Sequence, residues 1–239
     1  MVLDPMVHQK SVFVSRGTKR AEGEWSLSEL RLLGAFRRPL DIQRWLNRIA
    51  YDPEQGSRSP RWVMRERKAN CFEGALFAAA ALRFLGYPPL LVDLRSSDND
   101  DDHVIAVFRR RGAWGALAKS NYTTLRFREP VFRSIRELVM SYFEGYFNPW
   151  GHKTLREYSL PFNLARFDRR SWMTTDEKLE FMGDALDRSA HRKVLTPAMV
   201  RSLERADLDL VMAGLLGAKK EGLFKPRVAG KRKNSKHAA

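Results

Sequence analysis

Apolar residues recur every three or four positions through the first third of the chain, the spacing of one face of an α-helix. Ser26 is a suitable N-cap for a first helix, and Pro39 can open a second at its first turn. The strongest signal covers residues 71–85, where strong helix formers carry apolar side chains on most faces. We expect this helix to be buried in the core.

The ends of this central helix are marked in the sequence. Asn70 is a good N-cap, and Glu73 stands three residues later, as a capping box requires. Gly86 provides a C-terminal stop before two prolines. Cys71, the only cysteine, therefore lies in the first turn.

The hydrophobic pattern changes to that of β-strands after Gly86. Residues 90–94, 103–108 and 114–119 each read as a strand, and the short turn between the last two predicts a hairpin. The hairpin places His103 opposite a position between Ala118 and Ser120. A helix followed by an antiparallel sheet indicates an α+β fold with the cysteine helix packed on the sheet.

The second half of the chain predicts more helix than strand. Glu129-Pro130 opens a long amphipathic helix that runs to about residue 146. Residues 152–168 look extended, with Pro161 restricting any strand there to a sheet edge. Two further helices are expected, from the Thr174–Glu177 capping box to about residue 189 and over 196–217.

These elements divide the chain into four parts. Residues 1–23 form a loose N-terminal arm, in which residues 12–14 can make an edge strand. Residues 24–170 form the α+β domain, residues 171–217 a C-terminal helical annex, and residues 218–239 a basic, disordered tail.

Composition and charge narrow the class of protein. The chain has 239 residues, is 44% hydrophobic and contains one cysteine, so it is globular and has no internal disulfide. No apolar stretch approaches the ~18 residues of a membrane span, and no signal peptide is evident, so we expect a cytoplasmic protein. The net charge is +15, and the tail carries much of it. Such a tail can contact nucleic acid or an acidic partner, or simply be a solvated end.

The residues themselves suggest thiol chemistry. A cysteine in the first turn of a helix faces free backbone N–H groups, which favour the nucleophilic thiolate. His103 begins a core strand, and Ser120 and Asn121 lie beside it on the next strand. A thiol, an imidazole and a polar group that orients the imidazole are the parts of a cysteine acyl-transfer site. The alternative is that Cys71 is a small buried packing residue.

Three segments carry a resemblance to a known family. They are Asn70-Cys-Phe-Glu-Gly-Ala-Leu-Phe-Ala-Ala-Ala-Ala-Leu-Arg-Phe-Leu-Gly86, Asp102-His-Val-Ile-Ala-Val-Phe108 and Trp114-Gly-Ala-Leu-Ala-Lys-Ser-Asn121. Their order and spacing resemble the transglutaminase-like cysteine superfamily, which is related to papain-type proteases. The resemblance covers roughly residues 60–125.

The resemblance implies a transglutaminase-like core with Cys71 as nucleophile and His103 as its partner. The family usually has an aspartate four residues after the tryptophan, where this chain has Ala118. Asn121 is the preferred substitute, since an amide oxygen orients imidazole in papain-type sites, and Ser120 is the other candidate.

The remaining chemistry of the site follows from these assignments. The oxyanion hole needs the Cys71 N–H and a second donor, for which Asn70, Trp62 and Trp25 are candidates. The acidic run at residues 98–102 lacks the glycine and glutamate of a calcium loop. We expect no cofactor and no metal site.

Two functions remain open at this stage. The first is a cysteine-dependent hydrolase or acyl-transferase that acts on an amide bond of a peptide or protein. The second is a catalytically inactive module of the same fold that contacts nucleic acid or an acidic partner through its basic surface and tail.

Overall fold

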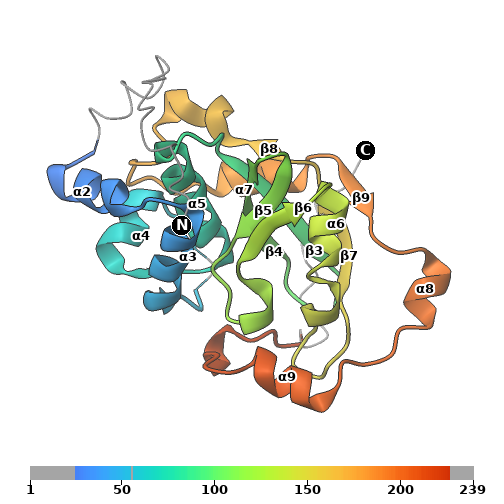
Figure 1. Cartoon of the computed structure of the whole chain (residues 1–239). Helices are drawn as coiled ribbons and strands as arrows, with labels where there is room; N and C mark the ends of the chain where they lie inside the picture. The colour runs from blue at the N-terminus through green and yellow to red at the C-terminus, as the bar shows by residue number, and fades with distance from the viewer. Residues whose placement is uncertain (1–24, 55, 227–239) are drawn as a thin grey trace, which may run out of the picture.

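A computed structural model of the chain describes residues 25–54 and 56–226. The fold is α+β, as the sequence predicts, and consists of helices on both faces of a mainly antiparallel sheet (Figure 1). The helices are α2 (Leu27–Ala35), α3 (Pro39–Arg48), α4 (Pro60–Glu66), α5 (Cys71–Phe84), α6 (Ile135–Met140), α7 (Glu180–Asp187), α8 (Pro197–Arg201) and α9 (Leu208–Gly214).

The main sheet has seven strands, and six follow the order β6-β5-β4-β3-β7-β9, with β8 also paired to β3. A separate parallel pair joins β1 to β2. The strands are β1 (Ala50–Tyr51), β2 (Lys68–Ala69), β3 (Leu90–Ser96), β4 (His103–Arg110), β5 (Ala113–Leu117), β6 (Arg128–Phe132), β7 (Leu155–Ser159), β8 (Phe162–Asn163) and β9 (His191–Lys193).

Alternate residues of β4 belong to different cores. Ala106 and Phe108 face the cluster that contains α5, whereas Ile105 and Val107 face a second cluster, which is built around α6 and the tyrosines after it. This alternation is the normal period of a strand. Figure 1 shows α2 to α5 gathered on one side of the sheet and α6 on the other. The central helix is buried from Glu73 to Leu82.

Three predicted helices have different bounds in the structure. The helix expected from a Thr174–Glu177 capping box to about residue 189 is α7, which begins at Glu180 with Leu179 as N-cap and no side-chain cap bond. The long helix over 130–146 is wrong at its start, because residues 128–132 form β6, which pairs with β5. Only residues 135–140 are α-helical. The helix expected over 196–217 is two short helices, α8 and α9.

The structure describes only part of the terminal regions predicted from the sequence. The possible edge strand at residues 12–14, the arm 1–23 and the last part of the tail lie outside the described residues. The domain boundaries stay predictions, although β9, within residues 171–217, pairs with β7 of the main sheet. Within the described ranges, no helix has the length and apolar character that crossing a membrane requires.

Candidate active site

Cys71 is the first residue of α5, and the predicted capping box is confirmed. The Asn70 side chain accepts a hydrogen bond from the Glu73 N–H at 2.9 Å, and the Glu73 carboxylate accepts one from the Asn70 N–H at 3.2 Å. The first turn of α5 is therefore held in one position, and Cys71 with it.

A buried network of ion pairs holds this turn in place. The Glu73 carboxylate is fully buried and lies 2.6 Å from Nε of Arg58. The same guanidinium reaches Asp52 at 2.7 Å and stacks on the Trp62 ring, with 3.6 Å between its central carbon and the ring centroid. The chain before α5 thus supplies the counter-ion that lets a capping glutamate be buried.

The Cys71 thiol lies on the wall of a cavity of about 620 Å³. Its sulfur is 3.9 Å from the Asp102 carbonyl oxygen. Burial raises the pKa of the thiol to about 11; the N–H groups of Val104 and Phe72 oppose this shift, and the carboxylates of Asp101 and Asp93 add to it. The thiol is therefore protonated at neutral pH in this state, despite its place at a helix N-terminus.

His103 begins β4, as predicted, and lines the same cavity. Its Nε2 is 3.0 Å from the Leu125 carbonyl oxygen. A carbonyl can only accept, so Nε2 carries the hydrogen and Nδ1 is the basic nitrogen of the neutral ring. Burial lowers the pKa of His103 to about 4, which makes the neutral ring the form present at pH 7.

The thiol and the imidazole share a cavity without being hydrogen-bonded to each other. By strand alternation His103 is on the face of Ile105, opposite the face that packs on α5. No hydrogen bond joins the Cys71 sulfur to either ring nitrogen in the described structure. The predicted nucleophile and its predicted base thus line one cavity in this state and have no ion pair.

Asn121 and Ser120 also line the cavity, but neither is bonded to His103. The Asn121 amide instead holds the backbone of Lys219, donating to its carbonyl and accepting from its N–H, each at 2.9 Å. The Ser120 hydroxyl accepts from the Tyr122 N–H at 3.0 Å. The geometry therefore gives no support to an orienting role for Asn121 or Ser120, and the Leu125 carbonyl takes that position.

Of the side-chain oxyanion donors expected from the sequence, Asn70 is occupied, and neither Trp62 nor Trp25 lines the cavity. Both amide hydrogens of Asn70 face backbone carbonyls, those of Glu54 at 3.2 Å and Gly56 at 2.8 Å. Trp62 lies under Arg58 and is not among the described residues that line the cavity, and neither is Trp25. The Glu73 N–H is bonded to Asn70, so the donors that the first turn of α5 retains are the N–H groups of Cys71 and Phe72.

Sequence reasoning missed a second histidine beside the cavity. His191 of β9 places Nε2 3.0 Å from the Asp93 carboxylate and Nδ1 2.7 Å from the Ser189 carbonyl. Asp93 lines the cavity, and both members of the pair are buried. The two residues are 98 positions apart, and no local signal joins them. Among the described residues, no group of three or more metal-binding side chains is close enough to hold a metal ion.

Part of the chain matches a known family. Residues 33–118 match the family model of the transglutaminase-like superfamily. The match runs from α2 to the end of β5, includes Cys71 and His103, and ends before Asn121. Residues 33–118 are therefore similar to the transglutaminase-like superfamily, which confirms the resemblance seen in this part of the sequence. A comparison with the curated proteins finds no match.

Proposed function

We propose that this protein is a cysteine-dependent amide hydrolase or acyl-transferase with Cys71 as its nucleophile. The observation that carries the proposal is the place of the thiol. It lies at the first turn of the central helix of a transglutaminase-like core and on the wall of a cavity that His103 also lines. Peptide or protein amides are the substrates that such a site would take.

In the proposed reaction one proton moves from Cys71 to His103 and from there to the leaving amine. The Cys71 thiol gives its proton to Nδ1 of His103, and the sulfur attacks the amide carbonyl carbon. The imidazolium then returns the proton to the leaving amine as the C–N bond breaks, which leaves a thioester on Cys71. Water or a second amine attacks the thioester and releases the sulfur as a thiol.

The Leu125 carbonyl has a definite role in this scheme. By accepting from Nε2–H it keeps Nδ1 unprotonated in the neutral ring, and it stabilises the imidazolium when Nδ1 is protonated. The scheme requires the thiol and Nδ1 to approach each other when substrate binds, because in the described state both groups are neutral and are not hydrogen-bonded to each other.

Trapping the thioester tests the proposal. The protein is incubated with p-nitrophenyl acetate, and the acetylated residue is located by mass spectrometry. We expect acetyl on Cys71, removable by hydroxylamine, and a rate of formation about 100-fold lower in His103→Gln because general-base catalysis is lost. His152→Gln is the matched control, since His152 does not line the cavity. An acylation rate at Cys71 that is the same in His103→Gln would refute the role of the base.

One observation favours the second candidate, an inactive binding module of the same fold. With burial raising the pKa of Cys71 and lowering that of His103, neither group is ionised at neutral pH. In this case Cys71→Ala leaves the biological activity intact. Binding to nucleic acid or an acidic partner through the basic surface and tail then weakens as salt is raised. If the protein is an enzyme, the opposite is expected: Cys71→Ala abolishes the activity, and raising the salt concentration leaves it intact.

A further inference from the structure

The C-terminal segment, residues 219–226, crosses the cavity that contains Cys71. Residues 221–225 of this segment line the cavity. Asn121 holds the segment by its backbone, through the two 2.9 Å hydrogen bonds to Lys219. An amide side chain that both donates to and accepts from one residue's backbone is independent of that residue's side chain. Lys219 is extended and residues Lys220–Gly222 form a 3₁₀ turn, so the same contact would suit any peptide with an extended residue at this position.

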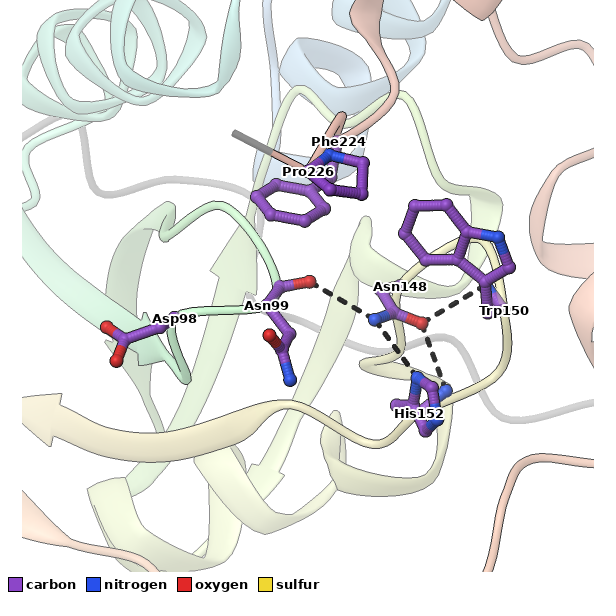
Figure 2. A pocket seen from close by; sticks show the side chains of 7 residues that line it. All are labelled: Asp98, Asn99, Asn148, Trp150, His152, Phe224 and Pro226. Atoms are coloured by element: carbon purple, nitrogen blue, oxygen red, sulfur yellow. Dashed lines mark hydrogen bonds between the residues drawn. The ribbon is translucent and has the colours of Figure 1, made fainter. Parts of the chain in front are cut away.

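Further along, the segment packs closely against aromatic residues. The backbone at Gly222 is so near the Tyr51 ring that an added Cβ would lie 2.7 Å from a ring carbon. The Phe224 ring meets Trp150 edge-on, with 6.4 Å between centroids. Figure 2 shows Phe224 and Pro226 over Asn99, at an adjoining cavity of about 400 Å³. The segment thus follows a continuous track from Asn121 to Trp150.

The walls of the cavity have the opposite charge to the protein as a whole. The chain carries +15, yet the Lys or Arg among the residues lining the cavity is Lys225, from the segment itself. The segment also places Glu221 in the lining. From the rest of the described chain, the charged side chains in the lining are all carboxylates, namely Asp52, Glu54, Asp93, Asp100, Asp101, Asp102 and Asp187. Asp52 and Asp93 have cationic partners elsewhere in the fold.

A buried hydroxyl points to a ligand independently of this charge. Tyr122 lines the cavity and is 8% exposed, and its hydroxyl has no hydrogen-bond partner in the described structure. A buried unpaired hydroxyl has a free-energy cost. The carboxylates of Asp100 and Asp101 are close enough to raise the pKa of this phenol, after the larger effect of burial. A ligand that brings a donor or acceptor here would remove the cost.

We propose that the cavity is a binding site for a cationic peptide segment and that residues 219–226 are its internal occupant. The inference rests on the proposed function, since it makes this peptide the substrate class of the Cys71 site. Asn121, predicted from the sequence to orient His103, is assigned here to the peptide backbone. A substrate must displace residues 219–226 to reach the thiol.

The test measures how fast maleimide modifies Cys71, the only cysteine, in full-length protein. Gly222→Val and Leu223→Asp each disturb the seated segment, the first by a clash with Tyr51 and the second by placing a charge at a partly buried leucine. Leu216→Asp is the matched control, because Leu216 is 73% exposed and does not line the cavity. A synthetic peptide of residues 219–226 is then added, alongside one with its three lysines replaced by glutamine.

We expect both segment variants to react at least tenfold faster than the parent and than Leu216→Asp. The lysine peptide should slow them again, and the glutamine peptide should protect much less. Unchanged rates in both variants, no protection, or equal protection by the two peptides would each overturn the inference. Alkylation requires no catalysis, so protection without a trapped thioester would refute the enzymatic proposal, and a thioester without protection would refute this one.

Discussion

At the scale of single residues, the surroundings of Cys71 decide both the ionisation of its thiol and the stability of its helix turn. A helix N-terminus favours thiolate, but burial outweighs it and raises the pKa of Cys71 to about 11. Two residues further on, in the same turn, the buried Glu73 carboxylate lies 2.6 Å from Nε of Arg58. The stability of the site therefore depends on a residue outside the helix.

Arg58→Ala is expected to destabilise the protein by about 3 kcal/mol, because it leaves the Glu73 carboxylate buried without its counter-ion. Chemical unfolding in urea at pH 7 measures the change. Arg65→Ala is the control: Arg65 is 54% exposed and its ion pairs are longer, so its loss should cost less than about 1 kcal/mol. Equal costs for the two substitutions would contradict the assigned role of the buried network.

At the scale of elements, α5 approaches the end of β5 more closely than a side chain allows. A Cβ added at Gly74 would lie far inside van der Waals contact with the Lys119 Cβ. The Lys119 ammonium in turn donates to the carbonyls of Leu46 and Ile49 at the end of α3, at 2.9 and 2.6 Å. Three elements thus meet around one glycine of the central helix.

Gly74→Ala should therefore destabilise the fold by about 1–3 kcal/mol through overpacking, although alanine is the better helix former. The matched substitution is Gly34→Ala in α2, where an added Cβ meets nothing within 4 Å. It should stabilise the protein by about 0.5–1 kcal/mol. Thermal unfolding of both variants measures the opposite signs, and stabilisation by Gly74→Ala would show that α5 does not contact β5 in this way.

Pairing between strands also explains why the long helix predicted from residue 130 differs from the observed structure. Residues 128–132 have a helix-opening proline, yet they form β6 because β5 otherwise has an unpaired edge. The gain comes from hydrogen bonds to a distant strand. A local helical pattern carries no information about such a partner.

At the scale of the whole molecule, the Asp93–His191 pair fastens the C-terminal part of the fold to the centre of the sheet. Both imidazole nitrogens of His191 face acceptors, so the ring is held as an imidazolium. Burial lowers the pKa of His191, but the hydrogen bonds to Asp93 and Ser189 outweigh this and raise it above its usual value, against some opposition from Arg95.

A raised folded-state pKa means that the pair stabilises the protein fully below the unfolded pKa of about 6.5 and progressively less as pH rises through the folded value. We expect the melting temperature of the parent to exceed that of His191→Gln by more at pH 6 than at pH 9. His152→Gln serves as the control, since His152 lies outside the pair. A difference that widens as pH rises would show that His191 is held neutral.

The sequence by itself determined the features whose signals are local. The capping box at Asn70, the stop at Gly86, the position of Cys71 and the β4–β5 hairpin all depend on residues a few positions apart. Their stabilising interactions form within one helix or one turn, so the pattern of residue types is enough to predict them.

Only the tertiary structure decided what each functional side chain contacts. Leu125 offers His103 a backbone carbonyl, which any residue type would provide, so no sequence pattern marks it. The predicted hairpin places Asn121 beside His103, but its amide binds Lys219, 98 residues away. Partners of this kind are chosen by how the sheet, α5 and the C-terminal segment pack together, because burial and hydrogen bonding act between whatever groups the fold brings within reach.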